Sequence, residues 1–360
     1  MNLSLGIVGL PNVGKSTLFN ALTKQNVLAA NYPFATIDPN VGIVPVSDIR
    51  VNKIAEISKP AKITPAVVEF VDIAGLVKGA ASGEGLGNKF LSNIKEVSAI
   101  VHLVRVFKNS NITHVENTVD PRRDIELINT ELILKDTETV ENRINTLKSK
   151  ARFDKDSADQ LEYLTNLLAH LNAGFLGLDF AEPASETVMA ERKYLFLLTD
   201  KPVIYLANSD DPTVAESIAL IKEAVGNKTV LALDVKTESE LASMTEDERE
   251  LFMQELGIEE TGLNRLTKEA YDLLGLISFF TEGPTEVRAW TIRKGSTAPE
   301  AAATIHTDFQ KRFIAAEVCA YKDFIEAGNW LKAKENGKVR LEGKTYIVQD
   351  GDIMIIKHNA

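Results

Sequence analysis

The sequence predicts an α/β fold with a mainly parallel sheet, an inserted pair of antiparallel helices and a smaller C-terminal α+β module. Apolar runs alternate with helix-like segments over residues 1–120, leucines and isoleucines recur at three- and four-residue steps over residues 122–195, and short strand patterns dominate after residue 278. The strand pattern resumes at residues 202–207 and 229–233. The helical pair is therefore expected as an insertion into the α/β domain rather than an addition to it.

These patterns also predict the domain boundaries. We expect an α/β domain from residues 1–121 and 196–277, an inserted helical domain from residues 122–195, and a C-terminal domain from residues 278–360. Within the last domain, the sequence predicts the following strands and helices: strands at Glu286–Ile292, Tyr346–Val348 and Ile353–Lys357, a helix at Ala298–Ile305, and a second helical turn near Phe309–Ala316.

Composition limits the class of protein. The chain has 360 residues, of which 44% are hydrophobic and 25% are charged, as in ordinary globular proteins. Its apolar runs are shorter than a membrane span, and the N-terminus enters the first strand without a basic leader. Cys319 is the single cysteine, which excludes an intrachain disulfide and fits a reducing compartment. We therefore expect a cytoplasmic protein, monomeric and without membrane contact.

The charge distribution bears on nucleic-acid partners. A net charge of −11 is unlike that of a general nucleic-acid binder, so we expect no stable DNA binding. Residues 277–360 are close to neutral, with 12 Lys+Arg and 11 Asp+Glu, so any RNA contact must come from a local patch. Basic residues gather near the predicted turn between the two helices: Arg143, Lys148, Lys150, Arg152 and Lys155, with Asp154 and Asp156 among them. This turn is either an RNA contact or an ordinary solvated helix end.

A glycine-rich turn between the first strand and the first helix gives the strongest chemical signal. It reads Gly9-Leu-Pro-Asn-Val-Gly14-Lys15-Ser16 and matches the pattern of a P-loop. Backbone N–H groups in such a turn point at phosphate oxygens, Lys15 adds a positive charge, and the Ser16 hydroxyl can ligate Mg²⁺. The sequence therefore predicts a nucleotide-binding site. The competing interpretation is a strand–turn–helix with incidental glycines.

Further motifs are expected around the phosphates and the metal. Asp72 ends a strand and can hold Mg²⁺ through water, and the N–H of Gly75 is suited to bond a γ-phosphate. Thr36, in a later loop, is a candidate to complete the Mg²⁺ shell. Taken singly, Asp72 could be a helix cap and Thr36 a plain loop residue.

The base-binding element is expected after the strand at residues 202–207. GTP-binding proteins of this architecture use Asn-Lys-x-Asp, whereas this chain has Asn208-Ser209-Asp210-Asp211. Because Ser209 replaces the lysine that stacks on the base, guanine selectivity is weakened, and an asparagine can serve an adenine edge equally well. A plain acidic turn is the alternative.

The residues expected to activate water are unusual. Leu76 stands where such enzymes often have glutamine, so hydrolysis is slow or another group performs it. Asn12 could hold a monovalent cation, K⁺ for example, against the phosphates. His102 is a second candidate, as a polar residue in an apolar strand, although a histidine there can also be a core residue.

Several long segments resemble one known family. They are Gly9–Thr17, Asn31–Val41, Val68–Leu91, Ala99–Arg105, Asn111–Glu131 and the C-terminal part from Phe279. They resemble the YchF/Obg-like ATPases over nearly the whole chain. The resemblance implies a Ras-like G domain of the TRAFAC class of P-loop NTPases, an inserted helical coiled coil and a C-terminal ubiquitin-like TGS domain.

The resemblance also implies roles for particular residues. The phosphates would be held by Asn12, Val13, Gly14, Lys15, Ser16 and Thr17, the metal by Ser16 and Thr36, and the base around Asn208 and Ser209. Leu76 matches the hydrophobic residue that the family has in place of the catalytic glutamine. His102 matches a family histidine that is proposed to act instead of that glutamine. The chain departs from the family at Asp211, where relatives commonly have glutamate, and at Leu233–Val235, where many have a Ser-Ala element.

Three functions therefore compete. The first is a ribosome-associated ATPase switch in translation or stress response, in which γ-phosphate orders Thr36 and residues 75–88. The second is a GTPase of ribosome assembly, which the fold favours and Ser209 opposes. The third is a nucleotide-gated binding module whose slow hydrolysis is incidental. In each case the basic turn between the inserted helices is a candidate contact with ribosomal RNA.

Overall fold

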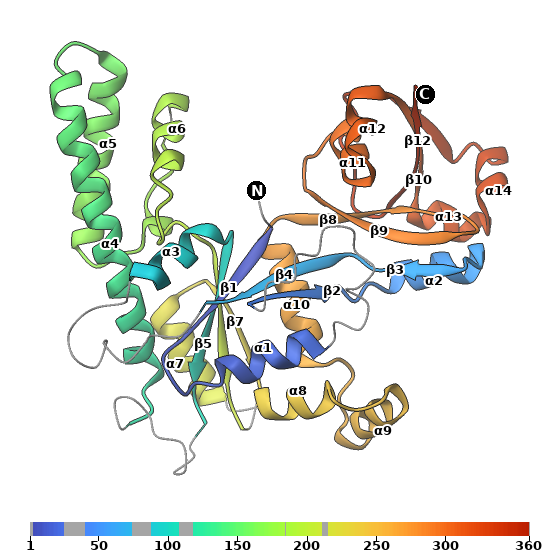
Figure 1. The fold of residues 1–360 in the computed structure, drawn as a ribbon, viewed down its shortest axis with the longest axis horizontal. Coiled ribbons are helices and arrows are strands. Elements are labelled where there is room, and N and C mark those ends of the chain that lie inside the picture. Colours follow the sequence, from blue (N-terminus) through green and yellow to red (C-terminus); the bar gives the residue numbers. More distant parts are fainter. Residues whose placement is uncertain are drawn as a thin grey trace. The chain divides into compact units, whose positions relative to one another are not determined.

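The computed structural model describes residues 3–24, 40–73, 88–107, 118–183, 185–210 and 215–359. Within these, residues 3–24, 40–42 and the described part of 69–262 form one compact unit. Residues 43–68 and 263–359 form a second. Each unit contains most of one six-stranded sheet (Figure 1).

The sheet of the first unit is largely parallel. Its strands are β1 (Ser4–Val8), β2 (Val41–Pro45), β4 (Val67–Asp72), β5 (Ala99–Arg105), β6 (Val203–Asn208) and β7 (Thr229–Leu233), in the order β2-β4-β1-β5-β6-β7. The pairs β1–β4, β1–β5, β5–β6 and β6–β7 are all parallel. Every residue of β1 and β5 is buried, as expected for central strands covered on both faces. The carboxyl ends of β1, β4 and β6 therefore meet at one edge.

The first unit also contains helices α1 (Lys15–Lys24), α3 (Asn88–Glu96), α7 (Ala215–Val225), α8 (Val235–Leu241) and α9 (Glu246–Leu256). Helix α1 packs beside α8. Ile125 in the first turns of α4 and Ile221 of α7 are buried in one cluster with Val104 and Tyr205 of the sheet. This core fixes the start of the helical insertion on the sheet.

The insertion is built on two long helices. Helix α4 (Pro121–Lys150) has 30 residues and begins at the N-cap Asp120, whose side chain accepts a hydrogen bond from the Arg123 N–H. Helix α5 (Lys155–Asn172) runs back along it, and α6 (Glu186–Leu195) packs against α5 (Figure 1). The predicted helical pair is thus confirmed.

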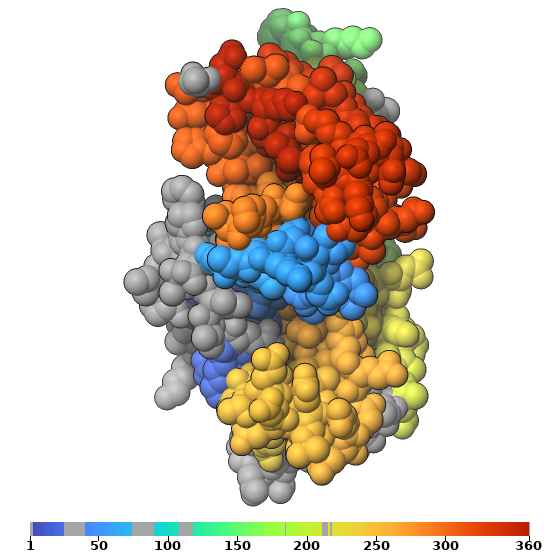
Figure 2. Space-filling view, turned by 90° about the vertical axis from the view of Figure 1, so that its right-hand side faces the viewer, coloured from blue at the N-terminus to red at the C-terminus, as the bar shows by residue number. Residues whose placement is uncertain are grey.

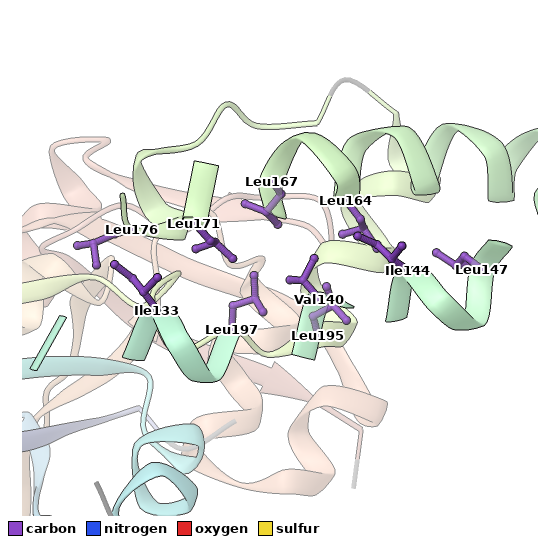
Figure 3. Close-up of a cluster of buried hydrophobic side chains, with 10 residues drawn as sticks. All are labelled: Ile133, Val140, Ile144, Leu147, Leu164, Leu167, Leu171, Leu176, Leu195 and Leu197. Carbon is purple, nitrogen blue, oxygen red and sulfur yellow. The ribbon is translucent and has the colours of Figure 1, made fainter. Parts of the chain in front are cut away.

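A continuous apolar core joins these helices. Figure 3 shows its side chains: Ile133, Val140, Ile144, Leu147, Leu164, Leu167, Leu171, Leu176, Leu195 and Leu197. Most members of α4 and α5 are three, four or seven residues apart, which is the spacing that puts side chains on one face of a helix. The hairpin therefore has its own hydrophobic core.

The base of the hairpin is fixed by a buried carboxylate. Asp136 of α4 accepts hydrogen bonds from the backbone N–H groups of Leu198 and Thr199, at 2.9 and 2.8 Å, and from the Thr199 hydroxyl at 2.7 Å. Burial raises its pKa from 3.8 to about 6, against the opposing effect of these three bonds. Asp136 thereby ties α4 to the segment that leads into β6.

The second unit contains a mixed sheet in the order β11-β10-β12-β8-β9-β3. Its strands are β3 (Lys62–Thr64), β8 (Leu276–Thr281), β9 (Glu286–Arg293), β10 (Phe313–Ala320), β11 (Val339–Glu342) and β12 (Asp352–His358). Its helices are α2 (Ile49–Ser58), α10 (Gly262–Leu273), α11 (Ala298–Ile305), α12 (Thr307–Arg312), α13 (Tyr321–Ala327) and α14 (Trp330–Glu335). None of the described helices in either unit is long and apolar enough to cross a membrane.

Residues 43–68 belong to the second unit, which the sequence did not predict. Strand β3 pairs in parallel with β9, and α2 packs on β9; Figure 2 shows these residues against the C-terminal segment. Arg50 also forms an ion pair with Asp350 at 2.7 Å. The predicted boundary at residue 278 does not include this segment, and the three-domain division stays a prediction.

One local prediction in the C-terminal segment was right only in part, and another was wrong. The helical turn expected near residues 309–316 is present as α12, but it ends at Arg312. Residues 313–320 form β10, because alternate side chains such as Ala316 and Val318 pack into the core under α11. Residues 346–348 do not form a strand, and Ile347 makes an isolated bridge with Thr297. Cys319 is buried, and burial raises the pKa of its thiol to about 11, so it is an inert core residue.

The hairpin core generates a stability prediction. Leu164 is fully buried between α4 and α5, so Leu164→Ala should lower the free energy of unfolding by about 3 kcal/mol through lost burial and the cavity left behind. Leu134→Ala, at a 56% exposed position of α4, should change it by less than about 0.5 kcal/mol. Urea denaturation measures both; equal losses would contradict the packing.

Candidate nucleotide-binding site

The P-loop connects β1 to α1. Two of its positions must be glycine because other parts of the chain lie close to their Cα atoms. Gly14 has φ +99°, and a Cβ there would lie 2.5 Å from Nδ2 of Asn208. A Cβ at Gly9 would lie 2.7 Å from the carbonyl oxygen of Leu103. Both distances are shorter than any real contact, so a side chain at either position would displace the loop.

The other P-loop residues divide into buried and exposed groups. Asn12 has φ 63° and is exposed, whereas Val13 is buried. Ser16 and Thr17 are exposed in the first turn of α1. The first-turn N–H groups have no partner within the helix and carry partial positive charge, so this end of α1 can hold an anion, with the Ser16 and Thr17 hydroxyls beside it.

Lys15 lies between the P-loop and the end of β4. Its Nζ donates to Oδ1 of Asp72 at 2.8 Å and to the carbonyl oxygen of Ile73 at 2.5 Å. The side chains of Lys15 and Asp72 are only 10% and 20% exposed. A cation and a carboxylate thus meet at the N-terminus of α1, while the predicted contacts of Lys15 with phosphate and of Asp72 with Mg²⁺ stay predictions.

Asn208 joins three segments of this edge. Its Nδ2 donates to the carbonyl oxygen of Val13 at 2.8 Å, and its Oδ1 accepts from the Val235 N–H at 3.2 Å. The next residue, Ser209, is also buried, and its N–H donates to the carbonyl oxygen of Leu233. The Asn208 side chain therefore links the P-loop, the end of β6 and the start of α8.

The segment Leu233–Val235 has defined partners in the structure. Asp234 is the N-cap of α8 and accepts from the Lys236 N–H at 2.9 Å, and Val235 is buried. The amide of Val235 and the carbonyl of Ile73 are the contacts that the sequence could not predict. Both are backbone atoms, which every residue carries, so no side-chain pattern signals them.

His102 lies in the middle of β5, inside the sheet. It is 3% exposed, it pairs in register with Val8 and Tyr205, and its ring centroid is 5.3 Å from that of Tyr205. Burial lowers its pKa from 6.5 to about 4, so the ring is neutral at pH 7. This is the environment of a core histidine, and it does not support the expectation that His102 activates water.

The residues present fit a magnesium ion. Ser16 and Asp72 offer a hydroxyl and a carboxylate, which are hard oxygen donors. Within the described ranges, no group of three or more His, Cys, Asp or Glu side chains could hold a metal ion. A metal at the P-loop would therefore take one or two protein oxygens and complete its shell with phosphate and water, which is the usual way of binding Mg²⁺.

Some predicted site residues lie outside the described residues. These are Thr36, Gly75, Leu76 and Asp211, together with the glycine-rich stretch that follows Gly75. The structure brings together Asn12 to Thr17, Asp72, Asn208 and Ser209 at one edge of the parallel sheet.

This edge defines the class of the protein. A P-loop before α1, an acid at the end of the adjacent β4 and an asparagine at the end of β6 define a P-loop nucleotide-binding protein with a GTPase fold. Residues 4–143 match a family model described as 50S ribosome-binding GTPase. Residues 276–359 match the YchF-GTPase C-terminal family, which is described as a protein of unknown function.

Full-length relatives identify the family. The chain is 51% identical to the ribosome-binding ATPase YchF of Bacillus subtilis and 50% identical to that of Haemophilus influenzae, in each case over 100% of both chains. A solved structure, titled as the YchF GTPase of Schizosaccharomyces pombe, superposes with a TM-score of 0.90 at 37% identity, over 99% of this chain and 98% of that one. The chain belongs to the YchF family.

The buried environment of His102 predicts a pH dependence of stability. Its folded pKa lies below its unfolded one, so between about pH 6.5 and 4 the unfolded chain binds a proton that the folded chain does not. His102 therefore lowers stability as the pH falls through this window. When the pH is lowered from 7.5 to 4.5, urea denaturation should show that His102→Gln loses about 2–3 kcal/mol less stability than the wild type.

The same variant tests the catalytic assignment. The Gln side chain does not titrate, and kcat for ATP should stay within about threefold of the wild type. His306→Gln, at an exposed position, is the control for a histidine change without burial. A 100-fold or larger fall in kcat at unchanged KM, of roughly the size that general acid–base groups contribute, would restore His102 to the catalytic set.

Proposed function

We propose that this chain is a ribosome-binding ATPase, which binds and slowly hydrolyses ATP as a molecular switch in translation or stress response. The Lys15–Asp72 pair at the N-terminus of α1 carries the nucleotide part of this proposal. The full-length identity to proteins named ribosome-binding ATPases supports the rest. Because ribosomes would be the partner, the cytoplasm is the proposed compartment.

The phosphate chemistry is assigned to residues at the P-loop. In this proposal the backbone N–H groups of residues 12–17 hold the phosphate oxygens and Lys15 offsets their charge. Ser16, Thr36 and Asp72 hold Mg²⁺, directly or through water, and the N–H of Gly75 bonds the γ-phosphate. Mg²⁺ held by these residues would supply positive charge beside the phosphates.

The hydrogen bonds of Asn208 support adenine as the base. The side chain has two N–H donors and two acceptor lone pairs, and among the described residues Val13 and Val235 take one of each. The remaining donor and acceptor match the N7 acceptor and N6 donor of adenine, whereas guanine presents two acceptors there. Ser209 also lacks the lysine stem that would stack on guanine. Both features favour ATP.

Slow hydrolysis is expected because the chain lacks the usual residue that positions the attacking water. Leucine at position 76 cannot orient an attacking water as glutamine does. We assign His102 to packing of the sheet, and propose that K⁺ near Asn12 adds the positive charge that the transition state needs. Replacing K⁺ by Na⁺ in the assay examines this last assignment, since a K⁺-dependent enzyme loses turnover.

Two other functions have specific support. The solved Schizosaccharomyces pombe relative is titled a GTPase, which favours GTP as the substrate of a ribosome-assembly factor. A nucleotide-gated binding module with incidental hydrolysis is favoured by Leu76. Single-turnover hydrolysis with and without ribosomes separates the module from the ATPase, because a pure module shows no stimulation.

Competition binding distinguishes ATP from GTP. With Mg²⁺ present, ATP should displace a fluorescent adenine nucleotide at a concentration at least about tenfold lower than GTP, as expected for one discriminating base contact of 1–3 kcal/mol. Lys15→Ala should abolish detectable binding of both, which controls for binding elsewhere. Tighter binding of GTP would overturn the ATPase assignment and favour the GTPase.

The turn between α4 and α5 is proposed to contact ribosomal RNA. Lys148, Lys150, Arg152 and Lys155 are exposed there. Arg143 does not share this surface, because its guanidinium pairs with the buried carboxylate of Glu191. Cations near RNA release counterions from its backbone, so the contact should weaken as salt rises.

Charge reversal tests the RNA contact. The triple variant Lys148→Glu, Lys150→Glu, Arg152→Glu should bind purified 70S ribosomes at least about tenfold more weakly at low salt, with a shallower salt dependence. Lys222→Glu, on the exposed side of α7, is the control for a charge change elsewhere. Unaltered affinity of the triple variant, measured by sedimentation, would remove the proposal.

A further inference from the structure

An aromatic side chain stands free at the turn of the helical hairpin. Phe153 is 92% exposed and is the most exposed of the large apolar side chains in the described part of the chain. Its backbone is fixed, because its N–H donates to the carbonyl oxygen of Lys150 at 3.0 Å and the following residue, Asp154, caps α5. The ring is therefore presented to solvent by an ordered turn.

Local helix structure does not explain this phenylalanine. It precedes the N-cap, where an apolar residue commonly packs against the fourth residue of the helix, here Ala158. An exposure of 92% excludes such packing for Phe153. The apolar core of the hairpin also does not include it. The residue thus gives the free protein no burial that would account for an aromatic ring.

Four cations and two acids flank the ring in sequence. Lys148, Lys150, Arg152 and Lys155 are exposed, and in the described ranges none of them forms an ion pair. Of the two nearby acids, Asp154 is engaged, since its Oδ2 accepts from the N–H and the hydroxyl of Ser157 at 2.9 and 2.5 Å. A cationic surface with a free ring lies on a chain of net charge −11.

We propose that Phe153 stacks on an unpaired RNA base, while Lys148, Lys150 and Arg152 contact the phosphates that flank it. Single-stranded loops and bulges are recognised in this way, by aromatic stacking combined with backbone charge. An apolar pocket on a protein would accept the ring but would gain little from four cations. The inference rests on the proposed RNA contact and adds the kind of nucleotide that is contacted.

The length of α4 separates this surface from the nucleotide site. Thirty residues at a rise of about 1.5 Å span roughly 45 Å, and the turn lies at the end of the hairpin remote from the sheet (Figure 1). A substitution at Phe153 therefore leaves the P-loop untouched. Basal ATP hydrolysis without ribosomes serves as the control for folding.

Three substitutions at Phe153 separate stacking from plain apolar contact. In equilibrium binding to purified 70S ribosomes, Phe153→Ala and Phe153→Leu should each weaken affinity roughly 10- to 100-fold, the range for loss of one base–aromatic stack. Phe153→Tyr keeps the π-face and should stay within about threefold of the wild type. Leu134→Ala, an exposed leucine on α4, controls for loss of any surface side chain. The salt dependence should be unchanged in Phe153→Ala, because no charge is lost.

Chemical probing of ribosomal RNA gives a second readout. One or more unpaired nucleotides protected by the wild type should become reactive with Phe153→Ala and stay protected with Phe153→Tyr. If Phe153→Leu binds as tightly as the wild type, the ring occupies an apolar pocket and the inference fails. If the triple charge variant is weakened but Phe153→Ala is not, the stacking fails while the RNA contact stands. If neither is weakened, both fail.

Discussion

The hydrogen bonds of the buried Asn208 side chain are the interactions on which the arrangement of the candidate site depends most. The side-chain amide bonds a carbonyl of the P-loop and a backbone N–H at the start of α8, and its own position is set by the end of β6. The absence of a side chain at Gly14 leaves room for that amide, since a Cβ there would lie 2.5 Å from its nitrogen. The proposed base-binding residue and the P-loop are therefore joined by one buried side chain.

The helical insertion meets the same α/β unit through a different kind of contact. Asp136 gives up solvation to accept three hydrogen bonds from residues 198 and 199, just before β6. Burial raises the pKa of Asp136, so its ionised form lowers the stability of the fold as the pH rises toward neutral. Burial of His102 has the opposite effect and lowers stability as the pH falls. Between about pH 4 and 6, the two groups therefore change stability in opposite directions. The apolar core of α4 and α5 stabilises the hairpin beyond this base, up to the turn that carries Phe153.

The sequence predicted the elements whose signal is local. The P-loop, the acid of Asp72 and the Asn208–Ser209 pair each follow an apolar strand, and parallel strands bring such ends to one edge. The leucine spacing likewise predicted α4 and α5. The helical turn expected near residues 309–316 ends at Arg312, and Phe313 and Ala316 pack in a strand under α11 instead. Long-range packing overrode local preference there.

The sequence by itself determined the chemistry: glycines for a phosphate loop, a lysine and an acid beside it, an asparagine without its lysine, and a basic turn. Only the tertiary structure decided which residues are exposed to solvent and which are buried or bonded to another part of the chain. His102 is in the sheet core, Arg143 is paired with Glu191, residues 43–68 pack with the C-terminal sheet, and Phe153 is free. The physical reason is that burial and partners come from segments far apart in the chain, and the pattern of one segment does not contain them.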